Sequence, residues 1–434
     1  MMVDSDSSSP PLLPGLEALL FACSRIYPDQ PNPLQVTALI KYWLGGPDPL
    51  DYISMYSNPG NPQLGIPPHW HYISFGLSDL HGDGRVHESR SVDERSGYGF
   101  ELTFRLKREI GETAPPTWPA NLLQSLAKYV FSSGNIFCAG DHISWNAALD
   151  GSESLIQHML IDNDPQLGTV NTACGTVDFI QIVGATYEEM KAAQKWNGKG
   201  VLELLKNVPN SGCGGLWLVT DMRRGETLFQ LDPNAIQLVE TGIETDGSNL
   251  SGVTASCSWT ENCEIKAYGG FDGSKEYEDT VQCGSGKENL TCDGQSFDGG
   301  LESKELMPNK VLESLHLTFN LESGSLLPLA LRGRLKHGRH FTIKSATNAT
   351  AITFVAESVS GTFVDTDKPY VSRGSWVQIL VNEELANQLL EKLQPLANNP
   401  EQIALPITYT WEDRKLSITI VSDDKYPDFN NIDS

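Results

Sequence analysis

One segment, from about residue 260 to residue 306, constrains the fold most, because it separates two stretches that carry the patterns of folded structure. It holds eleven Asp or Glu residues and eight Gly residues, against four Lys residues and no Arg. A segment of this composition cannot bury enough apolar area to offset the conformational entropy lost on folding. We therefore expect a disordered acidic insertion here, with folded structure on both sides.

The length of the chain predicts two domains. At 434 residues it exceeds one ordinary domain. Residues 1–14 are rich in Ser, Pro and Asp and are expected to form a disordered tail. The first domain is expected at 15–246. The second is expected at 247–434, joined to the first by a short hinge and containing the acidic insertion.

The first folded stretch mixes strand and helix patterns. Residues 99–108 are the clearest strand, because four apolar residues alternate with four polar ones. This alternation predicts one buried face and one solvated face. Other apolar patterns predict strands at 69–77, 176–184 and 216–222, and helices at 16–26, 34–43, 121–133, 187–196 and 201–208.

The second folded stretch is richer in strands. The helix expected at 382–396 begins with Asn382 as its N-cap, followed by Glu383 and Glu384 in the first turn. Strands are expected at 315–321, 351–359, 375–381 and 415–422. The predicted class is therefore α+β or mixed α/β, with two domains that each have a mixed β-sheet and flanking helices.

Charge and cysteine content limit the class of partner. The formal net charge of -24 opposes direct binding to nucleic acid and favours a basic protein as partner. The eight cysteines are too sparse for a disulfide scaffold, and the absence of any C-x-x-C pair removes the strongest zinc and redox motifs. Asp4 and Asp6 precede the apolar run 15–26, unlike the basic start of a signal peptide. We expect a soluble protein of a reducing compartment that does not bind membranes.

Two groups of residues raise the question of catalysis. His69 and His71 share one face of a strand, where they could be metal ligands or structural hydrogen-bonding groups. Asp141, His142 and Ser144 could serve hydrolysis, but no nucleophile elbow is present. We expect no enzymatic activity, no metal and no cofactor.

A basic segment at 332–340 stands out in so acidic a chain. On a strand, Arg332, Arg334 and Lys336 would share one face, and Gly338 would then form the turn of a hairpin. Two interpretations remain open. The segment is either a solvated strand face paired with nearby carboxylates, or a docking surface for an acidic or phosphorylated peptide or an internal acidic segment.

Several long runs, in order, resemble the Suppressor of fused family. They include YPDQPNPLQVTALIKYWLGGPDPLDYISMY at 27–56, HWHYISFGLSDLHGDGRVHE at 69–88, GFELTFRLKRE at 99–109 and LRGRLKHGRHFT at 331–342. The resemblance extends from about residue 15 to the C-terminus and skips only the acidic insertion.

This resemblance implies a negative regulator of Hedgehog signalling, present in cytoplasm and nucleus, that sequesters Gli-type zinc-finger transcription factors. A Ser-Tyr-Gly-His-Leu motif of the partner would lie as a β-strand between one edge strand of each domain, here 141–143 and 252–256. An alternative is a constitutive scaffold for kinase or kinesin-like proteins of the pathway.

The resemblance also implies which residues contact the peptide. These are Tyr129, Phe137 and Asp141 in the first domain, and Val253, Ala255 and Leu326 in the second. Asp141 would meet the histidine of the motif.

Alternatives remain for three of these residues. Tyr129 and Leu326 could be core residues, and Asp141 could instead form a turn. Five further residues are expected to support the region around the peptide: Asn163, Arg332, Arg334, His337 and Arg339. Because members of the family can carry an acidic residue at the position of Asn163, a reduced affinity is expected here.

Overall fold

The computed structural model describes residues 13–88, 90–261, 308–398 and 400–422. Most of the expected tail and most of the expected acidic insertion lie outside these residues. The chain divides into two compact units. The first unit comprises residues 1–251 and 332–337, and the second comprises residues 252–331 and 338–434.

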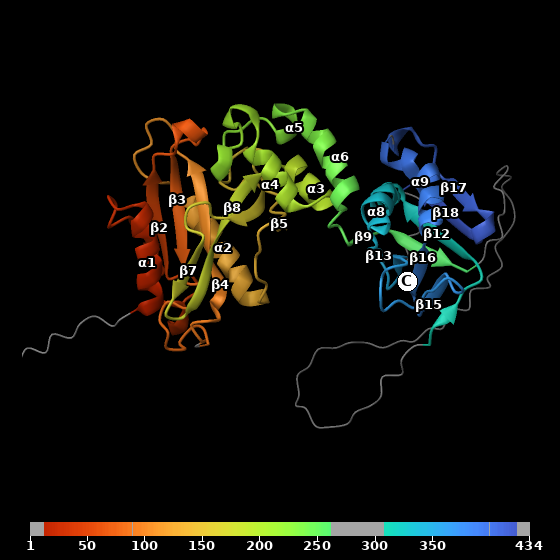
Figure 1. Ribbon diagram of the computed structural model, residues 1–434, viewed down its shortest axis with the longest axis horizontal. Coiled ribbons are helices and arrows are strands. Elements are labelled where there is room, and N and C mark those ends of the chain that lie inside the picture. Colours follow the sequence, from red (N-terminus) through yellow and green to blue (C-terminus); the bar gives the residue numbers. More distant parts are fainter. Residues whose placement is uncertain (1–12, 89, 262–307, 399, 423–434) are drawn as a thin grey trace, which may run out of the picture. The chain divides into compact units, whose positions relative to one another are not determined.

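The first unit is built on an eight-stranded mixed sheet (Figure 1). Its strand order is β1-β2-β3-β4-β8-β6-β5, and β7 pairs with β8. β4 and β8 are parallel, whereas the other neighbouring strands are antiparallel. The strands are β1 Leu34–Thr37, β2 Tyr52–Asn58, β3 His69–Phe75, β4 Arg95–Lys107, β5 His142–Ile143, β6 His158–Asn163, β7 Thr169–Thr172 and β8 Gly175–Ala185.

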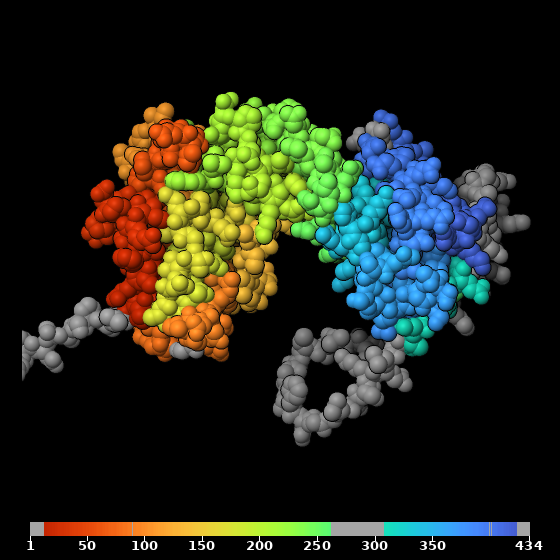
Figure 2. Space-filling model, in the orientation of Figure 1, coloured from red at the N-terminus to blue at the C-terminus, as the bar shows by residue number. Residues whose placement is uncertain are grey.

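Helices cover both faces of this sheet. On one face, α1 buries Leu19 and Cys23 against strand residues such as Phe75. On the other face, α2 buries Leu126 against strand residues such as Phe104. The helices of this unit are α1 Pro14–Ile26, α2 Trp118–Ser133, α3 Tyr187–Lys195, α4 Gly198–Lys206, α5 Leu228–Leu231 and α6 Asn234–Asp246. In Figure 2 the described atoms of this unit up to residue 251 are coloured from red, at α1, to green, at α6.

The prediction of one solvated face for the strand at 99–108 was wrong. Glu101, Thr103 and Arg105 are all fully buried, like the apolar residues that alternate with them. The cause is tertiary, because elements packed on the polar face of the sheet exclude water from that face as well. The buried polar side chains are therefore satisfied by one another and by backbone groups.

Two further expected elements take other forms. The helix expected at 34–43 is strand β1 followed by a 3-10 turn at Tyr42–Leu44, because the chain pairs with β2 in the register Leu34↔Met55. The strand expected at 216–222 starts in a 3-10 turn at Gly215–Trp217, and within it Thr220 pairs with β4 through an isolated bridge to Leu106. Leu218, inside this segment, has a φ angle of 48°, a left-handed conformation that interrupts an extended strand.

The second unit contains two sheets. A four-stranded sheet has the order β10-β12-β18-β17, and a six-stranded sheet has the order β11-β15-β16-β14-β13-β9. The strands are β9 Gly252–Ala255, β10 Cys257–Thr260, β11 Lys310–Val311, β12 Leu315–Asn320, β13 His340–Ser345, β14 Ala351–Ala356, β15 Tyr370–Arg373, β16 Trp376–Val381, β17 Ile407–Trp411 and β18 Leu416–Val421. Both sheets mix parallel and antiparallel pairs.

The helices of the second part of the chain are α7 Leu321–Ser325, α8 Leu327–Gly333 and α9 Glu383–Asn398. The predicted N-cap of α9 is confirmed, since the Leu385 N–H donates to Asn382 Oδ1 at 2.9 Å. The predicted strands at 315–321, 351–359, 375–381 and 415–422 are also present. The architecture is therefore mixed α/β, as expected. Among the described residues, no helix has the length and apolarity needed to cross a membrane.

Candidate functional site

Strand β5 forms one outer edge of the sheet in the first unit. It pairs with β6 in the register His142↔Leu160, and the Ile161 N–H donates to the Asp141 carbonyl at 2.9 Å. Backbone groups alternate in direction along an antiparallel strand. The N–H and C=O of His142 therefore point away from β6, to the side on which no described strand pairs with β5. This edge can accept an added strand.

An aromatic pair lies in the segments before β5. The rings of Tyr129 and Phe137 stack with centroids 5.8 Å apart and an interplanar angle of 16°. Tyr129 is 46% exposed, and its hydroxyl accepts a hydrogen bond from Asn135 Nδ2 at 2.6 Å. Phe137 is half-buried and packs against the core beneath α2. The core interpretation of Tyr129 was therefore wrong, although its neighbour Val130 is fully buried.

Asp141 ends a tight turn at 138–141 and is exposed. Its N–H donates to the Cys138 carbonyl at 3.0 Å, and its Oδ2 accepts from the Cys138 N–H at 2.8 Å. The turn-forming interpretation of Asp141 is therefore correct. It is also compatible with peptide binding, because the exposed carboxylate retains lone pairs for a second donor.

The described residues do not assemble a hydrolytic Asp-His-Ser set. The Ser144 hydroxyl contacts Met190 Sδ at 3.6 Å, and the Asp141 carboxylate is held by Cys138. Desolvation lowers the pKa of His142. A general base would need a hydrogen bond to the hydroxyl it activates, and the described contacts give no such bond to His142.

His69 and His71 are hydrogen-bonding groups inside the first unit. The Tyr27 hydroxyl lies 2.7 Å from His71 Nδ1, and His71 Nε2 lies 3.1 Å from Asp164 Oδ2. His69 Nδ1 lies 2.8 Å from the Pro67 carbonyl oxygen, and its Nε2 accepts from Arg105. All four ring nitrogens thus have protein partners. Among the described residues, no group of three or more His, Cys, Asp or Glu side chains is arranged to hold a metal ion.

The electrostatics of this interior keep both imidazoles neutral. Burial, followed by the positive charge of Arg105, lowers the pKa of His69 to about 3 and that of His71 to about 4. Burial alone would raise the pKa of Asp164, but Arg105 and His71 together lower it well below its usual range. The group is therefore a structural ion-pair network.

In the second unit, β9 is the outer strand of the six-stranded sheet. It runs parallel to β13 in the register Val253↔Ile343, and the Ala346 N–H donates to the Ala255 carbonyl at 3.1 Å. By the alternation of a parallel ladder, the backbone groups of Thr254 point away from β13. The side chains of Val253 and Ala255 are half-buried. This edge too can accept an added strand.

Leu326 lies between the two short helices α7 and α8. Its N–H donates to the Ser323 carbonyl at 3.2 Å, and its own carbonyl accepts from the Ala330 N–H at 2.9 Å. The side chain is half-buried, whereas that of the next residue, Leu327, is 2% exposed. Leu326 therefore presents part of its apolar surface outside the core.

The strand interpretation of the basic segment was wrong. Residues 332 and 333 end helix α8, a 3-10 turn follows at Leu335–His337, and β13 begins at His340. Leu, Ala and Arg are strong helix formers, so the run that leads into this segment continues a helix. Gly338, with a φ angle of 68°, lies in a turn, but the predicted hairpin is wrong, because a 3-10 turn and not a strand precedes it.

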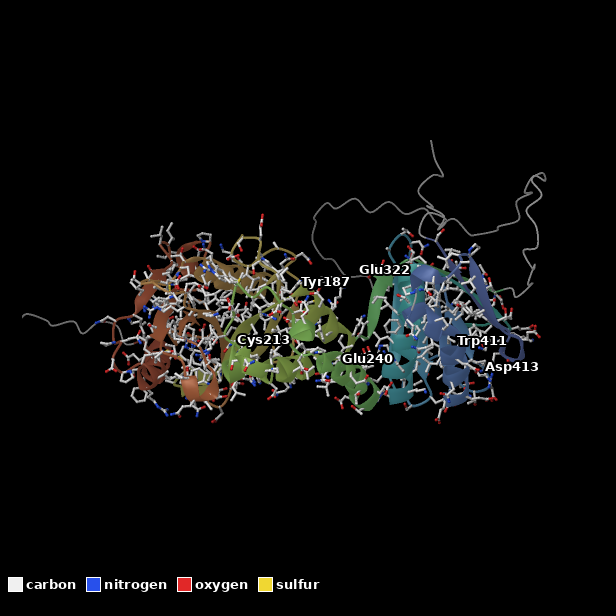
Figure 3. All side chains as sticks on the ribbon, turned by 90° about the horizontal axis from the view of Figure 1, so that it is seen from above. Tyr187, Cys213, Glu240, Glu322, Trp411 and Asp413 are labelled. Carbon is white, nitrogen blue, oxygen red and sulfur yellow. The ribbon has the colours of Figure 1, made fainter. Side chains whose placement is uncertain are left out.

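Local partners account for the two arginines at the start of this segment. The Arg332 guanidinium pairs with Glu240 of α6, which is labelled in Figure 3, and lies 3.7 Å from Glu244. Arg334 is 8% exposed and donates from Nη1 to the Ser248 carbonyl at 2.9 Å. The interpretation as a basic segment paired with nearby carboxylates therefore holds for Arg332, at the end of a helix and not on a strand.

The remaining supporting candidates come from two segments of the chain. His337 is the last residue of the 3-10 turn, and Arg339 lies just before β13; both are half-buried. Asn163 ends β6 with an exposed side chain, and its N–H donates to Asp162 Oδ1 at 2.9 Å. It lines a hollow of about 220 Å³ together with Trp217.

Comparisons with known proteins agree on one family. The model described as Suppressor of fused protein (SUFU) matches residues 46–225. The model described as Suppressor of Fused Gli/Ci N terminal binding domain matches residues 237–420.

Individual proteins resemble the chain over nearly its whole length. It is 52% identical to the Suppressor of fused homolog of Mus musculus and 51% identical to that of Homo sapiens, over 94% of this chain and 92% of each relative. The crystal structure of Drosophila Suppressor of Fused superposes with a TM-score of 0.76 at 38% identity, covering 95% of this chain and 97% of that one. A chain of the Sufu-Fu complex structure gives a TM-score of 0.51 at 53% identity, covering 53% of this chain and 98% of that one.

Proposed function

This chain belongs to the Suppressor of fused family, and from that premise we propose that it is a non-enzymatic negative regulator of Hedgehog signalling. Its partner would be a Gli-type zinc-finger transcription factor. The Gli/Ci-binding domain model, which covers residues 237–420, supports this choice of partner. A formal net charge of -24 suits a partner from a class of basic, DNA-binding proteins.

The mode of binding would be strand addition. A Ser-Tyr-Gly-His-Leu motif of the partner would pair with β5 of the first unit and with β9 of the second. The observation that carries this proposal is that each of these strands is the outermost strand of its own sheet. An edge strand offers unpaired backbone groups, which supply affinity, while neighbouring side chains supply specificity.

The residues around β5 suit two side chains of the motif. The exposed ring of Tyr129, stacked on Phe137, offers an aromatic surface to an apolar or aromatic side chain. The exposed carboxylate of Asp141 offers an acceptor to the imidazole of the motif, and this hydrogen bond is strongest when the imidazole is protonated. Val253, Ala255 and Leu326 would add apolar contact from the second unit.

Sequestration would follow from this binding. A transcription factor held by the chain would be retained in the cytoplasm, and the same complex in the nucleus would restrain transcription. Regulation would then need no catalytic step, consistent with the hydrogen-bonded state of His69 and His71 and with the contact of the Ser144 hydroxyl with Met190 Sδ.

Calorimetry with the full chain and a Ser-Tyr-Gly-His-Leu peptide tests the proposal. Asp141→Asn keeps an oxygen for the Cys138 N–H but removes the charge, whereas Asp141→Arg reverses it. We expect Asp141→Asn to weaken the peptide Kd by about tenfold and Asp141→Arg to weaken it further. Wild-type affinity in Asp141→Arg would reject the assignment of Asp141.

Hydrogen exchange tests the two edges separately. Peptide binding should slow exchange at the outward-directed amides of His142 and Thr254, because both would enter backbone hydrogen bonds. Protection at His142 alone would restrict the site to the first unit. Small-angle scattering should also show a smaller radius of gyration for the complex, and an unchanged radius would argue against a clamp.

A scaffold role is the second candidate. The structure of the Sufu-Fu complex, which resembles 53% of this chain, supports the capacity of this family to hold a further partner. Kinase or kinesin-like proteins of the pathway would be such partners. Binding of such a protein to chain already saturated with the peptide would support this role, and competition between the two would exclude a separate surface.

A further inference from the structure

The first residue of helix α4, Gly198, touches the turn that carries Asp141. A Cβ atom added at Gly198 would lie 2.0 Å from the Gly140 carbonyl oxygen and 2.8 Å from its carbonyl carbon. Both distances are far shorter than a van der Waals contact, and both atoms belong to backbone. Gly198 is buried, and no other residue type fits there without moving the turn.

The contact acts on one peptide plane. The Gly140 carbonyl and the Asp141 N–H belong to the same planar unit, so displacing the oxygen rotates the N–H with it. That N–H donates to the Cys138 carbonyl, and the Asp141 side chain accepts from the Cys138 N–H. A rotation of this plane would therefore disturb both hydrogen bonds that orient the carboxylate.

The turn at 138–141 also contacts β6 and Lys199. The Gly140 N–H donates to the Ile161 carbonyl at 2.7 Å, which ties the turn to β6. The aliphatic stem of Lys199 lies over Gly140, since a Cβ there would meet Lys199 Cγ at 2.9 Å. Gly140 itself has a φ angle of 98°, a left-handed conformation that favours glycine. The turn is thus enclosed by β6 and by the first two residues of α4.

We infer that Gly198 is a positioning residue for the candidate peptide site. Its missing side chain lets α4 approach the Gly140 carbonyl, and this approach fixes the orientation of Asp141. The inference rests on the proposed function for its meaning, because Asp141 is the group expected to meet the histidine of the bound motif. It adds a specificity-determining contact that lies outside the edge strand itself.

The first test compares Gly198→Ala with Gly225→Ala. Gly225 is exposed, has no neighbour within 4 Å of an added Cβ, and so controls for the substitution itself. Alanine has the higher helix propensity, so α4 is not weakened intrinsically by the change. We expect Gly198→Ala to weaken the Ser-Tyr-Gly-His-Leu peptide by about tenfold, and Gly225→Ala to leave its Kd unchanged.

A second peptide separates positioning from general damage. Ser-Tyr-Gly-Ala-Leu lacks the imidazole, so its weaker affinity should be the same for wild type and Gly198→Ala. In an Asp141→Asn background, Gly198→Ala should cause no further loss for the histidine peptide, because the two changes remove one interaction. Equal losses for both peptides, or fully additive losses in the double variant, would overturn the inference.

A pair of variants at Lys199 covers the case in which Gly198→Ala does not fold. Lys199→Ala removes the stem over Gly140, whereas Lys199→Met keeps carbon atoms in its place and removes the charge. We expect Lys199→Ala to weaken the histidine peptide several-fold and Lys199→Met to bind like wild type. Equal affinity for Lys199→Ala and Lys199→Met would contradict packing of α4 on the turn.

Amide exchange without peptide distinguishes failure of this inference from failure of the proposed function. In Gly198→Ala the amides of Asp141 and Cys138 should exchange faster than in wild type, while Gly225→Ala leaves both unchanged. Faster exchange in Gly198→Ala, together with no peptide binding by the wild-type chain, would retain the positioning contact and reject the function. Unchanged exchange in Gly198→Ala would reject the contact.

Discussion

Arg105 donates from one guanidinium nitrogen to both carboxylate oxygens of Asp164, at 3.0 and 2.9 Å, in the fully buried interior of the first unit. The same guanidinium donates to Gln181 Oε1 at 3.0 Å and to His69 at 2.9 Å. Trp217 covers it, with its ring centroid 5.3 Å away. A buried charge with so many partners forms a cooperative network, in which removing one member leaves the others unsatisfied.

Removing the carboxylate should destabilise the first unit strongly. Asp164→Ala leaves the charge of Arg105 buried without its counter-ion, and we expect a loss of about 3–5 kcal/mol in the free energy of unfolding. Asp48→Ala is the matched control, because Asp48 pairs with Lys128 at 2.8 Å on the exposed surface. Its cost should be about 1 kcal/mol or less. Urea denaturation measures both, and similar costs would show that the buried network is not coupled.

Stability should depend on pH through His69 and His71. The folded chain keeps both imidazoles neutral down to about pH 4 for His71 and about pH 3 for His69. The unfolded chain protonates them near pH 6.5, so protons favour unfolding below that pH. The stabilisation is complete above about pH 6.5 and declines as the pH falls, by about 1.4 kcal/mol per pH unit for each histidine.

Unfolding measured at intervals between pH 7 and pH 4 tests this dependence. His71→Gln retains a donor for Asp164 but does not titrate, so its stability should fall less steeply with decreasing pH than that of wild type. His142 is exposed, so solvent weakens the effect of its lowered pKa, and His142→Gln should change the slope less than His71→Gln. A His71→Gln slope equal to that of wild type would show that His71 does not carry the effect.

Local patterns were sufficient for several elements of the fold. The Asn382 cap and the two glutamates after it predict the start of α9, because helix capping is a property of a few neighbouring residues. The alternation at 99–108 likewise predicts a strand there. It does not reveal that Arg105 is buried, because that depends on the elements that cover the second face of the sheet.

At strand β1 the local sequence pattern predicts the wrong element. Residues 34–43 have helical spacing, yet Leu34 to Thr37 pair with β2, since a neighbouring strand decides the conformation of so short a segment. The strand prediction for the basic segment at 332–340 was wrong for a related reason. Arg332 and Arg334 have strand-like spacing, but the helix that precedes them continues through residue 333.

The candidate site was accessible to sequence reasoning only through resemblance. Whether β5 and β9 are outer strands depends on the order of strands in each sheet, and no local pattern encodes that order. The exposure of Tyr129 is another example, because its spacing places it beside the buried Val130 on the apolar stripe of α2. The contact of Gly198 with Gly140 joins segments distant in sequence and leaves no signal in either.

Tyr129 and Leu126 should respond differently to truncation, although both lie on α2. Leu126 is 3% exposed, so Leu126→Ala should cost about 2–5 kcal/mol in the free energy of unfolding. Tyr129→Ala should cost about 1 kcal/mol or less, since it removes mainly the stack on Phe137. Thermal unfolding measures both, and calorimetry should show at least about tenfold weaker peptide binding for Tyr129→Ala.

Tyr129→Phe is the control for that experiment. It keeps the ring and the stack, and removes only the hydroxyl that accepts from Asn135. We expect near-wild-type stability and peptide affinity if the ring face makes the contact. A large loss of stability in Tyr129→Ala, comparable to that of Leu126→Ala, would show that Tyr129 is a core residue and would reject its assignment to the peptide site.

Arg332 and Arg334 should contribute unequally to stability, because their partners differ in exposure. Arg334 is buried and donates to the Ser248 carbonyl, so Arg334→Ala leaves a buried acceptor with one hydrogen bond fewer and should cost about 1–3 kcal/mol. Arg332 pairs with Glu240 and Glu244 nearer the surface, and Arg332→Ala should cost about 1 kcal/mol or less.

The dependence of the unfolding free energy on ionic strength distinguishes the contribution of Arg332 from that of Arg334. Raising the ionic strength screens the exposed pairs, so the cost of Arg332→Ala should shrink in high salt, whereas that of Arg334→Ala should persist. The exposed Lys336 serves as control for loss of a positive charge in this segment, and Lys336→Ala should leave the unfolding free energy nearly unchanged. If Arg334→Ala were as mild and as salt-sensitive as Arg332→Ala, the segment would act as a charged surface and not as part of the packed interior.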